Sequence, residues 1–347
     1  MNVNWRRIGR MIYVPTIAGL ALMLAAVVFL LFISHPQING YYRAMFVDII
    51  YGHAFRPFVT RALLPVLVRI IAFSLPTEWK AAIVAADWRL AYSWEQEYLP
   101  EYLVASVLMY ASLAGFFFAL KYFIEGLYEL PRIFIDAVCL VALASLPAFF
   151  QYYSYVYDFP TLCLFTLGLG LLLRRKWTQF IVLFFLATVN KETSILLVLI
   201  FAIYFFRRNE LLDPKKFRQI LISQIFIYLV VRGGIAWIFR NNPGSLVEFH
   251  LLDHNLGLFH QHPSLAGIVI ALTLLALVFY KWMEKPAFVR FGFWIVWIAL
   301  FVAALFFGFL EEYRDYYEAY PLFVALAIHS LARVMRLPVQ VVSVNSL

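Results

Sequence analysis

Residues 177–206 read WTQFIVLFFLATVNKETSILLVLIFAIYFF, two apolar runs separated by the polar tetrapeptide Asn190-Lys191-Glu192-Thr193. Each run is short for a full membrane crossing, which takes about 20 apolar residues. The pattern therefore predicts a helical hairpin whose tip lies at or just below a membrane surface. Charged side chains at that depth are tolerated only where protein or water surrounds them, so the tip is a candidate functional site.

The rest of the 347-residue chain has the composition of a membrane protein. Hydrophobic residues make up 64% of it and charged residues only 14%, which is far from the usage of soluble globular proteins. The net charge of +8 does not indicate a nucleic-acid partner, because the basic residues form short clusters between apolar segments. Cys139 and Cys163 both lie in apolar segments and are expected to pack there rather than to form a disulfide.

Ten apolar segments predict an all-α polytopic membrane protein, with residues 1–347 forming a single transmembrane domain of about ten helices. The first segment follows Arg6, Arg7 and Arg10. It is too long for the core of a signal peptide, so we expect it to be retained as a helix. The expected spans lie near residues 12–34, 103–123, 132–150, 159–173, 177–190, 194–206, 219–239, 264–282, 291–310 and 318–334.

The distribution of charge predicts the orientation in the membrane. Most of the 28 Lys and Arg fall on one side of the predicted spans, as in Arg174-Arg175-Lys176 and Arg207-Arg208, and most of the 20 Asp and Glu fall on the other. The positive-inside rule makes the basic side cytoplasmic and places both termini there. Because the unusual polar clusters lie on the acidic side, we expect a site at the extracytoplasmic face of a bacterial inner (plasma) membrane.

Two external loops accompany the hairpin tip. Residues 35–102 form a long first loop, in which the stretch from Arg61 to Leu75 predicts an interfacial amphipathic helix with Arg61 and Arg69 on one face. The loop 240–263 is rich in histidine. If it is helical, two of its histidines share a face, as in some metal sites, but the loose spacing favours a polar external loop. Its histidines are His250, His254, His260 and His262, with Glu248 and Asp253 nearby.

The first external loop supplies a candidate base and two candidate phosphate ligands. Asp48 lies among aromatic residues near the membrane, where a partly shielded carboxylate suits general-base catalysis. It would otherwise cap a helix or pair with Arg43 or Arg56. Arg56 and Arg61 carry guanidinium forks that suit bidentate phosphate binding, although arginines beside an interfacial helix also contact lipid headgroups.

At the hairpin tip, the adjacent charges of Lys191 and Glu192 would both be desolvated if the tip is buried. We expect Lys191 to bind an anionic group and Glu192 to orient it, with Asn190 in support. The alternative is a tip that simply reaches water.

The last external turn reads Glu311-Glu312-Tyr313-Arg314. An arginine held rigidly among carboxylates suits the positioning of a phosphate, so Arg314 is a candidate ligand with Glu311 and Glu312 in support. A surface ion network of little energetic value is the alternative. Asp158 is a further supporting candidate, although Asp158-Phe159-Pro160 also reads as the start of a helix.

The order of these features resembles the GT-C superfamily of integral-membrane glycosyltransferases. It consists of a first span, a long external loop with an acidic residue and membrane-parallel helices, many further spans with a charged hairpin tip, and a late Glu-x-x-Arg turn before a Pro-led helix. The resemblance covers nearly the whole chain as topology but only short pieces as motif. Asp48 lacks the adjacent second acidic residue of many members. We expect no C-terminal periplasmic domain, so acceptor recognition is expected to come from the loops.

The resemblance implies a transferase that uses a polyprenyl-phosphate sugar as donor and a glycan, lipid or protein as acceptor. Asp48 would match the catalytic acidic residue and Arg314 the basic residue set against the lipid phosphate, while Lys191 and Glu192 are assigned by position. No metal-binding motif is evident, and a divalent cation is left open. The alternatives are a flippase or transporter of lipid-linked glycans, a polysaccharide polymerase or ligase, and a structural membrane subunit.

Overall fold

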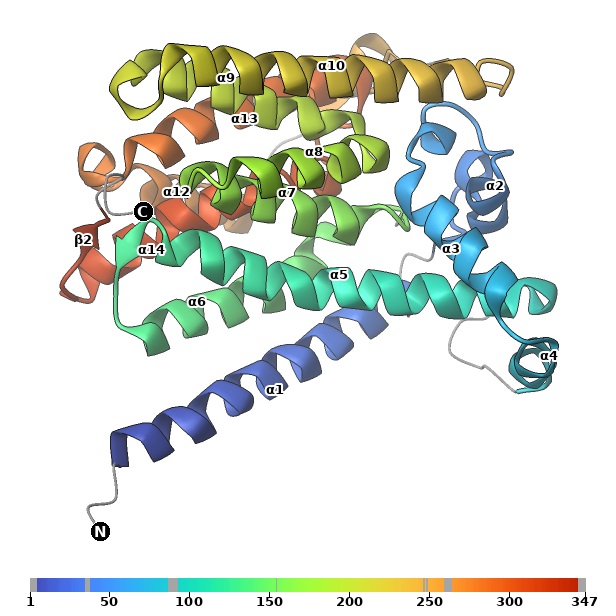
Figure 1. Ribbon diagram of the computed structural model, residues 1–347, viewed down its shortest axis with the longest axis horizontal. Helices are drawn as coiled ribbons and strands as arrows, with labels where there is room; N and C mark the ends of the chain where they lie inside the picture. Colours follow the sequence, from blue (N-terminus) through green and yellow to red (C-terminus); the bar gives the residue numbers. More distant parts are fainter. Residues whose placement is uncertain are drawn as a thin grey trace.

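The computed structural model describes residues 5–34, 38–86, 93–153, 155–245, 247, 249–258 and 264–342. Within this part of the chain nearly all regular structure is helical, and the long helices lie roughly side by side (Figure 1). The helices are α1 (Trp5–Ser34), α2 (Phe46–Tyr51), α3 (Leu63–Ser74), α4 (Thr77–Ala85), α5 (Leu99–Glu125), α6 (Arg132–Ala144), α7 (Asp158–Leu173), α8 (Trp177–Asn190), α9 (Ile195–Arg207), α10 (Pro214–Ile238), α11 (Leu256–Leu258), α12 (Leu265–Phe279), α13 (Ala287–Phe307) and α14 (Tyr320–Val334). Two short strands, β1 (Tyr128–Glu129) and β2 (Gln340–Val341), pair antiparallel.

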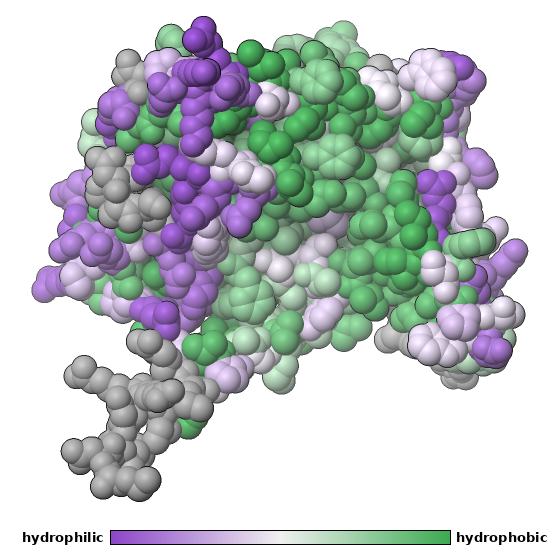
Figure 2. Space-filling model, viewed as in Figure 1, coloured by the Kyte–Doolittle hydropathy of each residue, from purple (hydrophilic) through white to green (hydrophobic). Residues whose placement is uncertain are grey.

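Five helical segments are long and apolar enough to cross a membrane, namely Ile12–Ser34, Gln96–Glu125, Arg132–Phe149, Pro214–Ile238 and Ala287–Phe307. Figure 2 shows the same property on the surface, where a hydrophobic band separates two more hydrophilic ends. A band of this kind is stable only where lipid replaces water as the solvent. The predicted class, an all-α membrane protein, is therefore supported. The shorter apolar helices α7, α8, α12 and α14 coincide with other predicted spans, and the total of ten crossings stays a prediction.

The predicted hairpin at residues 177–206 is confirmed as a pair of helices, α8 and α9. Helix α8 ends at Asn190 because Lys191 takes an extended backbone conformation (φ −155°, ψ 145°). A single 3-10 turn, Glu192–Ser194, then leads directly into α9. Below, the end of the bundle that carries Arg174, Arg175 and Arg208 is called the basic end, and the hairpin turns at the opposite end.

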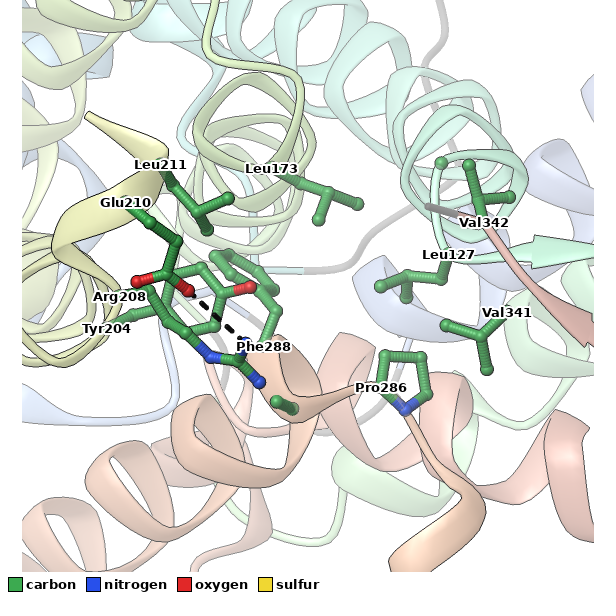
Figure 3. Close-up of a pocket in the computed structure, with 12 residues that line it drawn as sticks. Leu127, Leu173, Tyr204, Arg208, Glu210, Leu211, Pro286, Phe288, Val341 and Val342 are labelled. Carbon is green, nitrogen blue, oxygen red and sulfur yellow. Dashed lines mark hydrogen bonds and ion pairs between the residues drawn. The ribbon is translucent and has the colours of Figure 1, made fainter. Parts of the chain in front are cut away.

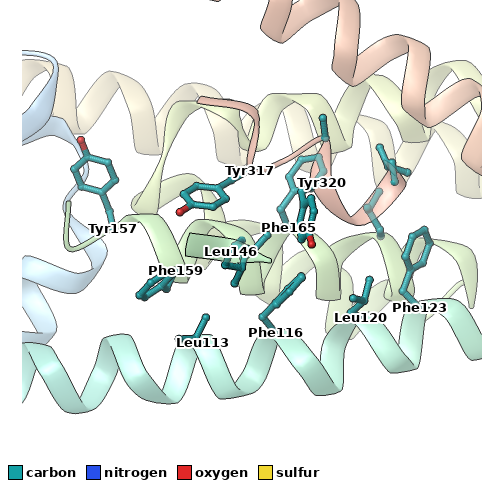
Figure 4. Close-up of a cluster of buried hydrophobic side chains, with 14 of the residues drawn as sticks. Leu113, Phe116, Leu120, Phe123, Leu146, Tyr157, Phe159, Phe165, Tyr317 and Tyr320 are labelled. Carbon is teal, nitrogen blue, oxygen red and sulfur yellow. The ribbon is translucent and has the colours of Figure 1, made fainter. Parts of the chain in front are cut away.

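The core is organised around the packing of α5 against α7. Leu113, Phe116, Leu120 and Phe123 recur every three or four residues on α5, and each side chain is fully buried. Figure 4 shows them in a row that faces Phe159 and Phe165 of α7. Because lipid tails are as apolar as these side chains, close packing rather than exclusion of water holds the two helices together.

Glycine allows this close approach at two places. A Cβ on Gly115 of α5 would lie 2.9 Å from the sulfur of Cys163, and one on Gly170 of α7 would lie 2.7 Å from a ring carbon of Tyr122. Cys139 and Cys163 are both free thiols, as expected of cysteines that pack within apolar segments.

The loop predicted to be the first external one, residues 35–102, contains the short helices α2, α3 and α4 and keeps that name below. Helix α4 is seen end-on in Figure 1, whereas α5 runs across the view. The predicted start of the amphipathic helix at Arg61 is wrong, because α3 begins at Leu63 and Arg61 lies in the preceding turn. Arg61 is buried and Arg69 is exposed, so the two do not share a helical face. The contacts of Arg61 with Tyr157 and Glu192, described below, hold it in this turn.

The loop after α10 is fixed to the end of α13 by one buried side chain, Asn255. Its amide nitrogen lies 3.0, 2.8 and 2.9 Å from the carbonyl oxygens of Ala304, Leu305 and Gly308, and its oxygen accepts from the backbone N–H of Leu310 at 3.1 Å. These carbonyls belong to the last turn of a helix, where backbone partners run out.

Substitution of Asn255 by alanine is expected to lower the free energy of unfolding by about 1–3 kcal/mol, because the buried carbonyls at the end of α13 lose their donor. Thermal unfolding of the purified protein in detergent measures the effect. Asn242→Ala serves as a control for a less buried loop contact, because Asn242 is only half-buried and its amide reaches the carbonyl oxygens of Gly52 and Ala54 at 2.8 and 3.0 Å. It is expected to change stability less.

Candidate functional site

Five segments that are distant in sequence meet where the α8–α9 hairpin turns. They are the turn before α3, the start of α7, the hairpin tip, α10 and the turn before α14. Among the described residues, eight charged side chains form ion pairs there and are called the ion-pair cluster below, namely Arg61, Lys191, Glu192, Arg232, Glu312, Arg314, Asp315 and Glu318. Four candidates of the sequence analysis, Arg61, Lys191, Glu192 and Arg314, lie in this cluster.

Glu192 joins the first external loop, the hairpin and α10. One carboxylate oxygen lies 2.9 Å from Nη2 of Arg61, and the other lies 3.4 Å from Nη2 of Arg232. Arg61 also donates to the hydroxyl of Tyr157, and Arg232 donates to the carbonyl oxygen of Thr60 at 3.0 Å. The Glu192 side chain is 35% exposed, against 11% for Arg61 and 17% for Arg232. Of these three side chains, Glu192 is therefore the most accessible to a ligand.

Lys191 and Glu318 form the most deeply buried ion pair of the cluster. The Lys191 Nζ lies 3.2 Å from Oε1 of Glu318, and the side chains are 6% and 0% exposed. The hydroxyl of Thr193 donates to the same carboxylate oxygen. The other oxygen of Glu318 is buried without a partner in the described part of the chain. Removal of either charge would leave the other one buried and uncompensated.

Arg314 is held on three sides. Its Nε and Nη2 lie 2.8 and 2.7 Å from Oε1 of Glu312, and its Nη1 lies 3.9 Å from Oδ1 of Asp315. The guanidinium carbon lies 4.3 Å from the centroid of the Tyr155 ring, a cation–π contact. Burial raises the pKa of the Glu312 carboxyl above its ordinary value, and the charge of Arg314 opposes that effect. Arg314 thus contacts two carboxylates and one aromatic ring, and its rigid role toward a phosphate stays a prediction.

Asp158 and Asn190 position the backbone around the cluster. The Asp158 carboxylate accepts a hydrogen bond from the backbone N–H of Tyr155 at 3.0 Å and closes the turn that opens α7. Asn190 donates to the carbonyl oxygen of Tyr157 at 3.2 Å and to the hydroxyl of Thr161 at 2.8 Å, which ties the end of α8 to the start of α7. Both side chains are buried, so they support the site by fixing where the helices begin and end.

Glu311 points the opposite way from Glu312, toward the His-rich loop. Its Oε1 accepts hydrogen bonds from the hydroxyl of Tyr152 at 3.0 Å and from His254 Nε2. Burial would raise the pKa of Glu311, but hydrogen bonds from its own backbone, His254 and Tyr152 hold it below its usual range. Glu311 therefore fixes the loop, and among the described residues it forms no ion pair with the cluster.

The two described histidines of the loop do not share a partner. His254 binds Glu311, whereas Nδ1 of His250 lies 3.0 Å from Oδ2 of Asp253. His260, His262 and Glu248 lie outside the described residues. In the part of the chain that the structure describes, no group of three or more His, Cys, Asp or Glu is arranged to hold a metal ion.

Asp48 lies on α2, in the first external loop. Its backbone carbonyl accepts hydrogen bonds from the N–H groups of His53 and Ala54 at 2.8 and 3.1 Å and so forms the turn after α2. Within the described residues its carboxylate has no ion pair or hydrogen bond. The side chain is thus available for chemistry, and no contact of the structure joins it to the ion-pair cluster.

Arg56 is bound by the loop that follows α10 rather than by the cluster. Its Nη2 donates to the carbonyl oxygen of Gly244 at 2.6 Å, and its backbone N–H donates to the carbonyl oxygen of Pro243 at 2.9 Å. Gly244 has a φ of +83°, and a Cβ there would lie 2.7 Å from the carbonyl oxygen of Arg56. Only glycine suits that position. The sequence analysis did not predict this contact between the two external loops.

Three residues of the site escaped the sequence analysis, namely Arg232, Glu318 and Tyr157. Arg232 stands in an apolar helix, and a charge there was a signal of a buried partner. Glu318 follows Arg314 by four residues in the turn before α14, and its total burial could not be read from an acidic, Tyr-rich turn. Tyr157 resembled one more aromatic residue at a membrane surface, but its hydroxyl accepts from buried Arg61.

The two cavities of interest differ in size and place. A small one of about 10 Å³ lies beside Lys191 and Asn190, enough for about one water molecule. A larger cavity of about 310 Å³ lies at the basic end, lined in part by Arg208 and Phe288 (Figure 3). The ion-pair cluster and the larger cavity therefore lie at opposite ends of the bundle.

The cluster has the properties of a site for an anionic ligand. Four cations converge there, and in the low dielectric of a buried site each interacts strongly with any charge that comes near. Each cation already contacts a carboxylate, so an incoming phosphate would replace Glu192, Glu318 or Glu312 as the partner. Comparisons of the chain with models of protein families, with curated proteins and with solved structures found no match.

Proposed function

We propose that the protein is a membrane glycosyltransferase of the GT-C type, which moves a sugar from a polyprenyl-phosphate donor to an acceptor at the extracytoplasmic membrane face. One observation carries the proposal. Four segments far apart in sequence bring buried arginine and lysine side chains together at the end of an apolar bundle that is remote from the basic end. A cluster of this kind, next to lipid, suits a substrate that is both anionic and lipid-linked.

The reaction follows from the chemistry of the donor. The acceptor hydroxyl oxygen attacks the anomeric carbon of the sugar, the bond between that carbon and the phosphate oxygen breaks, and the electron pair leaves with the phosphate. In this proposal Asp48 takes the proton of the hydroxyl. Arg314 and Lys191 stabilise the negative charge that develops on the phosphate, with Arg61 and Glu192 holding the clamp in place. Displacement from the face opposite the leaving group inverts the configuration of the anomeric carbon.

Arg56 has a different role in this scheme from the one that its sequence suggests. Its side chain holds the loop after α10 against the first external loop. We therefore propose that Arg56 fixes the shape of the part of the site that binds the acceptor, and that it does not contact the phosphate directly. The isoprenoid tail would lie along the apolar band, where lipid-facing helices border the cluster.

Transfer of label from a polyprenyl-phosphate sugar to an acceptor fraction by the reconstituted protein tests the function. Wild-type protein is expected to produce a labelled acceptor and free polyprenyl phosphate. Passage of the intact donor across the bilayer, without cleavage, would instead identify a flippase. Failure of mono-phosphate donors together with transfer from a diphosphate-linked glycan would identify a polymerase or ligase.

Arg314→Lys is the informative variant in this assay, because lysine keeps the charge opposite Glu312 but lacks the guanidinium fork. It is expected to lower the transfer rate about tenfold or more, since a lost hydrogen bond to a charged group is worth about 1.5–3 kcal/mol. Arg240→Lys, at an exposed position after α10, is the matched control. Equal rates for both variants and for wild type would remove Arg314 from the phosphate clamp.

A further inference from the structure

The cavity of about 310 Å³ lies at the basic end, at the edge of the apolar band where α9 ends and α13 begins. Figure 3 shows that most of the labelled side chains around it are apolar, among them Leu127, Leu173 and Phe288. Polar groups are confined to one rim, which Tyr204, Arg208 and Glu210 form. A hollow of this size falls at the lower end of the range of ligand sites, about 300–1,000 Å³. Its lining therefore suits a molecule with an apolar body and one polar end.

The polar rim contains one cation, Arg208, whose side chain can turn toward another partner. Nη1 of Arg208 lies 3.4 Å from Oε1 of Glu210, and both side chains are about half exposed (50% and 56%). An exposed ion pair of this length contributes little to stability. An arginine so placed can turn to a phosphate, for which its planar fork is well suited. The neighbouring Arg207 and Arg175 add positive charge at the same end of the bundle.

One wall of the cavity is formed by the short C-terminal segment that contains β2 and Val342. Val341 and Val342 line the hollow, and the segment is held by the pairing of β2 with β1 and by the bond from the N–H of Val342 to the carbonyl oxygen of Leu127, 3.0 Å long. Val341 is 45% exposed. A two-residue strand held at its edge can move aside far more easily than a packed helix.

We propose that this cavity binds one acyl chain of an anionic phospholipid, with the phosphate of the lipid on Arg208 and the chain between Leu127, Leu173 and Phe288. The positive-inside rule puts the basic end at the cytoplasmic leaflet, where anionic lipids are concentrated and each basic residue near the surface contributes to binding them. The proposal is independent of the glycosyltransferase function, because the cavity and the ion-pair cluster lie at opposite ends of the bundle.

Photo-crosslinking tests the proposal. The full-length protein is reconstituted in phosphatidylcholine vesicles that contain phosphatidylglycerol with a diazirine at the end of one acyl chain, and the adducts are mapped by mass spectrometry. Adducts are expected to concentrate on the cavity-lining residues. The same diazirine on phosphatidylcholine is expected to give about fivefold fewer adducts there, because one basic residue contributes about 1 kcal/mol to the binding of anionic lipid.

Two substitutions and their matched controls decide the outcome. Ala287→Trp fills the cavity and is expected to abolish adducts on the cavity-lining residues, whereas Ala271→Trp, on the exposed surface of α12, is expected to leave them unchanged. Arg208→Gln is expected to remove the preference for phosphatidylglycerol, and Arg218→Gln, an exposed arginine at the same end, is expected to keep it.

Each variant is checked by thermal unfolding, and Leu211→Phe provides a milder filling if Ala287→Trp does not fold. Adducts spread evenly over the apolar band, or undiminished in a folded cavity-filled variant, would overturn the proposal.

Discussion

Replacement of Asp48 by asparagine is expected to lower the rate of sugar transfer about 10²–10⁴-fold, the usual contribution of a general base. An amide has the shape of the carboxyl group but cannot accept the proton of the acceptor hydroxyl. The fold around it is expected to persist, because the turn after α2 depends on the backbone carbonyl of Asp48 and not on its side chain. Initial rates of transfer, measured at saturating donor with the reconstituted variant, give the effect.

The matched control is Glu97→Gln, which removes an exposed carboxylate from the same external loop and is expected to leave the rate unchanged. A second control is the melting temperature of the Asp48→Asn variant, which is expected to stay close to that of the wild type. If the Asp48→Asn enzyme transfers sugar at the wild-type rate, Asp48 is not the base, and the base must be sought among the other external carboxylates.

Replacement of Lys191 by methionine is expected to lower the free energy of unfolding by about 3–5 kcal/mol, because it leaves the carboxylate of Glu318 buried without its counter-charge. Methionine has a similar volume to lysine, so the loss of packing is small by comparison. Titration of the purified protein with denaturing detergent, followed by its helical circular dichroism, measures the change.

The double variant Lys191→Met, Glu318→Gln separates the loss of a charge from the loss of a pair. It is expected to recover most of the stability, because a neutral amide replaces the stranded carboxylate and can still accept the hydrogen bond of Thr193. Lys215→Met, at an exposed position near the start of α10, is the control for the loss of a lysine and is expected to be nearly neutral. A single variant Lys191→Met as stable as this control would show that Lys191 is not needed to balance the charge of Glu318.

Local pattern predicted the helices and the places where they end. The hairpin at 177–206 followed from two apolar runs and four polar residues between them, and its two helices end within a few residues of the expected positions. The long spans were recognised in the same way, since an apolar segment in lipid must satisfy its backbone hydrogen bonds within itself. The start of α3 was misjudged because the apolar run continues through Arg61, whose burial depends on residues far along the chain.

The pairing of charges could not be predicted from local pattern. Arg61 and Glu192 are candidates of the sequence analysis, but their contact, and the participation of Arg232, depend on how α10 packs against the hairpin. Lys191 was expected to bind an anionic group, and within the fold that group is Glu318, which stands in the turn before the last helix. Charges of opposite sign in a chain can pair in many ways, and only the tertiary packing selects one of them.

The pairing of β1 with β2 has a consequence for biosynthesis. It joins the link between α5 and α6 to a segment that follows α14, so the ladder can form only after the translocon has released the helices between them into the bilayer. Contacts between such distant points of a chain are late events in assembly. Failure of the ladder to form would therefore report incorrect insertion or packing of the helices between the two strands.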